Sequence, residues 1–152
     1  MLSHRDIARA LLIESYSDLK AAEVLLDAGV YARCIAHCQH TVEKALKAAL
    51  AVRHVIVTDR HEVSDDFRQT YSDWGHCEEI GEIATEMEEE GFRTEYPLFG
   101  RRDLPIWIPS ERYLEKDARD ALQKAEHVFK IVMEYLANEY GITIGEAWRP
   151  RS

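Results

Sequence analysis

Apolar side chains recur every three or four residues over most of the chain, which is the spacing of an amphipathic α-helix. The first such segment covers about residues 4–27. Ser3 precedes it as a predicted N-cap with Asp6 three residues later, and Gly29 follows it at the position that commonly closes a helix. The face predicted to be buried carries Ile7, Leu11, Leu12, Leu19, Ala22 and Leu26.

Three further segments share this periodicity, and the connections between them lack it. The helices predicted by these segments cover about residues 30–52, 77–90 and 110–140. A short additional helix is expected to begin near His61, and Ser110 is the predicted cap of the last helix. Residues 92–109 hold most of the prolines and predict an irregular loop, which at this length is usually functional or flexible.

Long helices joined by short connections predict an all-α fold, an antiparallel helical bundle. A chain of 152 residues is the right size for one domain with a single core. We therefore expect one helical domain over residues 1–140 and a C-terminal tail over residues 141–152.

The charge and cysteine content narrow the classes of partner. The chain has 19 basic and 28 acidic residues and a net charge of −9, so a general coat on nucleic acid is not expected. It has no apolar run of the roughly 18 residues that a membrane span needs, and no secretory signal is visible at the N-terminus. Three cysteines, an odd number, fit a reducing compartment better than a disulfide framework. These features predict a cytoplasmic protein without a membrane partner.

The second predicted helix has two distinct faces when its residues are placed about 100° apart. Its apolar face carries Cys34, Ile35, Cys38, Val42, Ala45, Leu46 and Ala49. Its other face, named here the basic stripe, consists of Arg33, His37, His40, Lys44 and Lys47. Two interpretations are open: an anion-binding surface for a nucleotide, RNA phosphate or acidic partner, or an ordinary solvated face in which Glu43 pairs with Lys47.

A metal site is not expected, although Cys34, His37 and Cys38 have a spacing that can share an ion. Both cysteines lie in the middle of the apolar face, about 100° from the histidine. Buried cysteine acting as a small apolar side chain is the commoner situation.

The second helix resembles the signature helix of the HEPN family (higher eukaryotes and prokaryotes nucleotide-binding). The family pattern is approximately a tyrosine, several residues, and then His-x-Gln-x-x-x-Glu-Lys-x-Leu-Lys-Ala. The matching residues here are Tyr31, His37, Gln39, Glu43, Lys44, Leu46, Lys47 and Ala48. His61 with the acidic residue after it, and the run from Arg93 to Pro97 that includes Tyr96, resemble further family segments.

The resemblance covers about residues 5–137 and implies a four-helix up-and-down core with an extra short helix. It also implies a homodimer that binds a nucleotide or another small anionic ligand, or that partners a minimal nucleotidyltransferase in a toxin–antitoxin-like system. No cofactor is implied. The candidate ligand-binding residues are His37, Lys44, Lys47, His61, Arg93 and Tyr96.

Some members of the family are metal-independent ribonucleases with an Arg-x(4–6)-His motif, and RNA is the less expected partner here. Arg33 and His40 form such a string and project from one side of the helix, which makes them candidate catalytic residues. In nuclease members the motif lies nearer the C-terminal half, where no histidine closely follows Arg93. A binding module is therefore the first expectation, a ribonuclease the alternative and a pure protein-interaction domain the second alternative.

Overall fold

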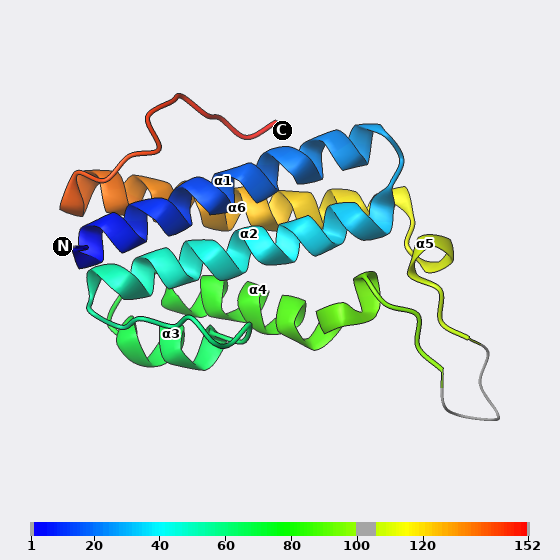
Figure 1. Cartoon of the computed structure of the whole chain (residues 1–152), viewed down its shortest axis with the longest axis horizontal. Helices are drawn as coiled ribbons and strands as arrows, with labels where there is room; N and C mark the ends of the chain where they lie inside the picture. The colour runs from blue at the N-terminus through cyan, green and yellow to red at the C-terminus, as the bar shows by residue number, and fades with distance from the viewer. Residues whose placement is uncertain (1, 100–105, 152) are drawn as a thin grey trace.

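A computed structural model describes residues 2–99 and 106–151 and confirms the all-α antiparallel bundle (Figure 1). Its helices are α1 (His4–Asp27), α2 (Tyr31–Val52), α3 (Ser64–Thr70), α4 (Cys77–Glu90), the 3-10 turn η1 (Gly91–Thr94), α5 (Pro109–Arg112) and α6 (Glu115–Tyr140). Among the described residues there is no β-strand; Leu98 and Trp107 exchange a single pair of backbone hydrogen bonds.

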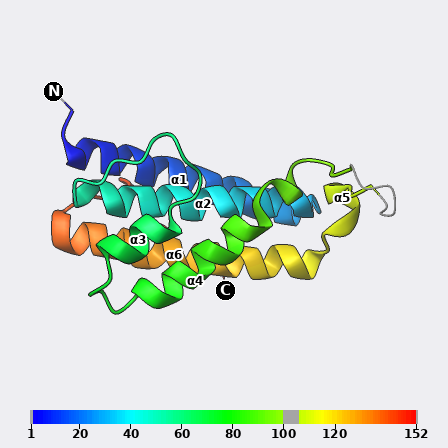
Figure 2. The ribbon, with the colours of Figure 1, turned by 90° about the horizontal axis from the view of Figure 1, so that it is seen from below.

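The four longest helices run alternately up and down, with α2 at the centre (Figures 1 and 2). α1 and α6 lie against one side of α2, and α4, preceded by the short α3, lies on the other. The connection between α2 and α3 runs back along α2 before α3 begins. In the described part of the chain, no helix is both long and apolar enough to cross a membrane.

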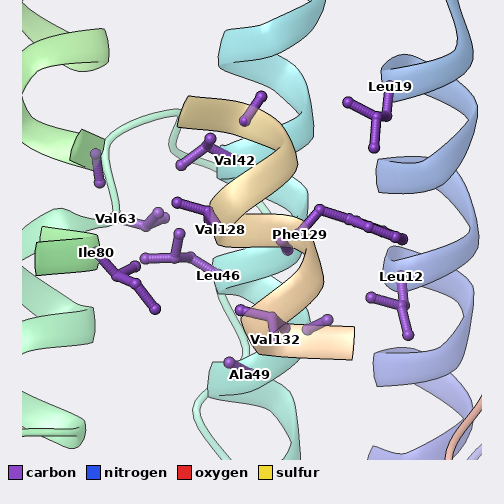
Figure 3. Close-up of a cluster of buried hydrophobic side chains, with 14 of the residues drawn as sticks. Leu12, Leu19, Val42, Leu46, Ala49, Val63, Ile80, Val128, Phe129 and Val132 are labelled. Atoms are coloured by element: carbon purple, nitrogen blue, oxygen red, sulfur yellow. The ribbon is translucent and has the colours of Figure 1, made fainter. Parts of the chain in front are cut away.

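The core is built from the predicted apolar faces, with α2 contributing to both sides of it (Figure 3). Leu12 of α1 and Phe129 of α6 are fully buried together on one side of α2. Leu46 faces Val63 and Ile80 on the other. Because α2 is covered on both sides, nearly every residue of its last two turns is buried, and its remaining polar face is correspondingly narrow.

Two helix starts differ from the sequence prediction because side chains distant from the predicted caps determine them. The short helix begins at Ser64 rather than near His61, because Glu88 of α4 accepts hydrogen bonds from the backbone N–H groups of Val63 (2.7 Å) and Ser64 (2.9 Å). Glu88 also accepts one from the Ser64 hydroxyl (2.5 Å). This carboxylate therefore caps α3 from another helix.

The last predicted helix is divided in two. Ser110 lies within the single turn of α5 instead of capping a long helix, and the backbone is extended at Tyr113 and Leu114 before α6 begins. Asp117 accepts a hydrogen bond from the backbone N–H of Leu114 at 2.9 Å, which satisfies one of the free donors at the start of α6. Pro109 fits the first position of the short turn, where it needs no hydrogen-bond donor.

The C-terminal tail lies on the bundle instead of projecting away from it. The Trp148 ring packs edge-on against Phe129 with centroids 5.1 Å apart. Arg151 donates its backbone N–H to the buried carboxylate of Glu126 (2.8 Å) and binds Asp27 through its guanidinium (2.9 Å). Burial raises the pKa of Glu126, and the neighbouring carboxylate of Glu23 raises it further. The tail thus covers Glu126 at a buried position that disfavours its ionised form.

Candidate functional site

One carboxylate on α1 joins two members of the basic stripe. Asp18 accepts a hydrogen bond from Nδ1 of His37 at 2.9 Å and from Nζ of Lys44 at 2.7 Å. The Asp18 side chain is only 12% exposed, whereas the side chains of His37 and Lys44 are about a third exposed. Because hydrogen bonds to a charged group are among the strong ones, Asp18 holds both side chains against the α1–α2 interface.

Two stripe residues, Arg33 and His40, are bound to the segment that follows α4. The guanidinium of Arg33 donates to the carbonyl oxygen of Thr94 (2.7 Å), and Nε2 of His40 lies 3.3 Å from a carboxylate oxygen of Glu95. These are the two residues of the Arg-x6-His string, and the structure turns both toward neighbouring positions on one segment. The rings of His40 and His37 have centroids 6.2 Å apart.

The last stripe residue is nearly buried. Nζ of Lys47 donates to Glu43 at 2.8 Å, as its spacing of four residues predicts, and the lysine is only 7% exposed. Glu43 also accepts from Nδ1 of His61 at 3.2 Å. His61 is therefore held over α2 by its imidazole and does not cap α3.

Every member of the basic stripe consequently has an oxygen partner inside the protein. The carboxylates among these partners are those of Asp18, Glu43 and Glu95, so their charges offset those of the stripe. An incoming phosphate would meet N–H groups that are already partly paired, and the carboxylates beside them would repel it. The stripe is thus internally paired, and an anion that binds it would have to act on side chains that already have protein partners.

The two remaining candidates come from the connection after α4. Arg93 lies over the Trp107 ring, 4.7 Å from its centroid, and its carbonyl accepts a hydrogen bond from the indole N–H at 2.7 Å. Tyr96 is 59% exposed and lines a groove beside α2. Arg93 and Tyr96 are thus on the same segment as the partners of Arg33 and His40, but Arg93 is engaged with an aromatic ring.

The cysteines belong to the core. Cys34 and Cys38 are fully buried and unpaired, and the contact between their sulfur atoms lowers the pKa of Cys34 and raises that of Cys38. Over residues 2–99 and 106–151, no group of three or more His, Cys, Asp or Glu side chains is placed to hold a metal ion. His37 is turned toward Asp18, away from both thiols.

A groove of about 820 Å³ lies between α2, residues 59–66 (the end of the α2–α3 connection and the first turn of α3), the second half of α4 and Tyr96. Its size is in the range of ligand-binding clefts, about 300–1,000 Å³. Buried apolar side chains form its floor, and carboxylates surround them; we call this feature the acidic groove. The carboxylates are those of Glu43, Asp59, Glu62, Asp65, Asp66, Glu88 and Glu95. Among the described lining residues, the only Lys or Arg is Arg60, which pairs with Asp66 at 2.9 Å.

The sequence did not identify Asp18, Glu88 or Glu95 as members of the site. Asp18 lies 19 residues before His37, and Glu95 lies 55 residues after His40, so no local spacing indicates either pair. Gln39 belongs to the signature helix, and its side-chain oxygen accepts from the Thr94 hydroxyl at 3.3 Å. Only the Glu43–Lys47 pair could be expected from helical spacing alone.

Comparisons with known proteins agree with this bundle. The HEPN domain family matches residues 8–136. A protein of Methanocaldococcus jannaschii described as "Putative toxin MJ1304" is 32% identical over 145 residues, which cover 89% of this chain and 91% of that protein. The crystal structure of TT1696 from Thermus thermophilus superposes with a TM-score of 0.69 at 26% identity, covering 84% of this chain and 96% of that one. The protein described here belongs to the HEPN domain family.

Proposed function

We propose that this protein is a toxin-like HEPN module that works by binding a protein partner in a toxin–antitoxin-like pair. The similarity to the archaeal protein named as a toxin supports the toxin-like part of the proposal. The partner class implied by the family resemblance is a minimal nucleotidyltransferase. The acidic groove supports the other part of the proposal, that the chain binds a protein partner.

The groove supports a protein partner better than a nucleotide because of its charge. Seven carboxylates and one guanidinium line it, so the field inside it repels phosphate groups and attracts cations. The cations that could have offset this field, those of the basic stripe, already have partners. A mixed apolar and charged groove of this kind is typical of a surface that recognises a polypeptide.

Growth of a bacterial host tests the proposal. Induced expression of the chain is expected to slow or arrest growth, compared with the same plasmid carrying an early stop codon. Co-expression of a nucleotidyltransferase encoded beside this gene is expected to restore growth. Unimpaired growth, or arrest that the flanking protein does not relieve, would contradict the proposal.

A metal-independent ribonuclease is a second candidate, favoured by the two imidazoles on α2. Asp18 orients His37, and His40 lies beside it with ring centroids 6.2 Å apart. In such a reaction His37 would take the 2′-hydroxyl proton as the 2′-oxygen bonds to phosphorus. The bond to the 5′-oxygen would break, and His40 would give that oxygen a proton.

Cleavage of RNA in the presence of EDTA tests this second candidate. Activity that falls at least about a hundredfold in His37→Ala and in His40→Ala, but persists in His127→Ala, would support it. Arg33→Ala would report whether the guanidinium stabilises the phosphate. Absence of cleavage, or equal activity in all four variants, would exclude it.

The homodimer implied by the resemblance stays a prediction. Several exposed apolar side chains could contribute to a contact between copies or with a partner: Tyr96, Phe99, Ile106, Ile108 and Leu114. Light scattering on the purified chain would give the mass directly. A mass of 17.6 kDa at all concentrations would correspond to a monomer.

A further inference from the structure

The carboxylates of the acidic groove divide into two groups. Those on α2, on α4 and after α4 have internal functions: Glu43 pairs with Lys47, Glu88 caps α3 and Glu95 contacts His40. Of the four at residues 59–66, two contact Arg60: Asp59 at 3.9 Å and Asp66 at 2.9 Å. Glu62 and Asp65 are exposed and have no hydrogen-bond or ion-pair partner among the described residues.

The floor between these carboxylates is apolar. It contains Val42, Val63 and Ala84, which are at most 2% exposed, together with the half-buried Met87. A free inorganic cation makes no apolar contact with this floor, and the thin methylene spacers of a polyamine cover little of it. A polypeptide can cover it with apolar side chains while its basic side chains reach the carboxylates at the rim.

A polar group at the same place lacks its partner. Gln39 lines the groove, and its buried side-chain Nε2 has no acceptor among the described residues. An unsatisfied buried amide costs free energy, and the carbonyl oxygen of a bound peptide would satisfy it once the Gln39 side chain turns toward the groove. A simple cation offers no such acceptor.

We propose that the acidic groove binds a basic, amphipathic segment of a protein partner, with Arg or Lys side chains at Glu62 and Asp65 and apolar side chains over the half-buried Met87. The proposal deepens the proposed function, on which it rests, by naming the surface and the chemistry of the segment that it binds. Complementary charge at the rim speeds encounter and selects the partner, while the floor supplies apolar burial.

Fluorescence anisotropy with a labelled synthetic peptide tests the proposal on the full chain. The probe alternates arginine and leucine over about ten residues, and its counterpart carries glutamate in place of arginine. We expect saturable binding of the arginine peptide, weakened by raising the salt concentration, and none of the glutamate peptide. Binding of both peptides, or of neither, would overturn the proposal.

Matched variants distinguish binding at the acidic groove from attraction to the net negative charge of the protein. The double variant Glu62→Gln/Asp65→Asn and the control Glu134→Gln/Glu139→Gln remove the same two charges, the control from an exposed part of α6. We expect about a tenfold loss of affinity in the first and less than about a twofold change in the second, as two lost rim contacts would give. Equal losses in both would show attraction to the overall negative charge and overturn the groove assignment.

Competition and mapping complete the test. Spermine is expected to displace the peptide only weakly, because its methylene spacers cover less of the apolar floor than leucine side chains do. Backbone amide shifts on adding the peptide are expected at residues 59–66 and 84–91. Displacement by spermine at the peptide's own concentration, or shifts confined to other surfaces, would overturn the proposal. These binding results do not depend on toxicity, so the growth assay remains a separate test of the proposed function.

Discussion

The basic stripe and the acidic groove lie on neighbouring surfaces of α2, yet their charges are used in different ways. Each stripe residue is bound to an oxygen of the protein, such as the Asp18 carboxylate that holds both His37 and Lys44. The groove keeps carboxylates such as Glu62 and Asp65 without partners among the described residues. The basic stripe was visible in the sequence, but the charges without partners among the described residues are carboxylates of the acidic groove.

The difference shows that the charge of one helix face is a poor guide to what it binds. Asp18 of α1 and the segment after α4 supply most of the oxygens that bind its basic side chains, and only the Glu43–Lys47 pair is local in sequence. Glu62 and Asp65, just before and in the first turn of α3, are exposed and have no such partner among the described residues. The stripe is therefore expected to matter for stability and the groove rim for recognition.

Asp18→Ala is expected to have the largest effect on stability, because it leaves His37 and Lys44 without their shared acceptor. A loss of about 2–3 kcal/mol in the free energy of unfolding is the range for hydrogen bonds to a charged, largely buried group. Chemical denaturation would measure it. Asp73→Ala, at an aspartate that is 81% exposed, is the control and should change stability by less than about 1 kcal/mol. Equal losses would remove the structural role assigned to the stripe.

Glu88→Ala should have the next largest effect, since this groove carboxylate is one of those with an internal function. Loss of the cap on α3 is expected to cost about 1–2 kcal/mol. Hydrogen exchange should quicken at the amides of Val63 and Ser64, which lose their acceptor. Glu89→Ala, at the exposed neighbour on α4, is the control. Unchanged exchange at both amides would contradict the capping role.

Glu126→Gln extends the comparison to a third kind of carboxylate, one that is buried beneath the tail. Its pKa is raised in the folded protein above the ordinary value of 4.5, so the folded state favours the protonated form. The stability that this group contributes is complete below about pH 4.5 and is lost as the pH rises through the folded pKa. The variant should therefore match the wild type in melting temperature near pH 4 and exceed it near pH 7. A variant less stable than the wild type at pH 7 would show that the folded protein stabilises the ionised Glu126 carboxylate, and would contradict this prediction.

Glu62→Gln/Asp65→Asn should have the smallest effect on stability. Neither side chain has a partner to lose among the described residues, so a change within about 0.5 kcal/mol is expected. Denaturation of the double variant beside Asp18→Ala measures the contrast between the two regions directly. A loss comparable with that of Asp18→Ala would mean that the rim holds the fold together, and the distinction would fail.

Elements with local signals were predictable from the sequence. α1 begins after Ser3, whose hydroxyl accepts the N–H of Asp6 while the Asp6 carboxylate accepts the N–H of Ser3, and both residues are visible in the chain. α4 likewise has the predicted bounds, closed at Gly91 with a positive φ of 52°. The starts of α3 and α6 were not found because Glu88 and the break at Tyr113 act through tertiary contacts and backbone geometry.

For the candidate site, the sequence indicated the residues of the basic stripe but neither their partners nor the groove. The angular positions on α2 placed the stripe residues together correctly, and the signature helix indicated the family. Whether Lys44 is free or bound depends on Asp18, which reaches it only when α1 packs against α2. The groove was invisible to sequence analysis for the same reason, because α2, α4 and residues 59–66 form it only when folded.

Titration calorimetry with ATP at low salt tests most directly whether the stripe is internally neutralised. The wild type and Lys44→Ala are compared, with the arginine–leucine peptide as a positive ligand for the groove. Saturable heat is predicted with the peptide and none with ATP in either protein. Saturable binding of ATP to the wild type that is lost in Lys44→Ala would show that the stripe is open to anions and would contradict the account.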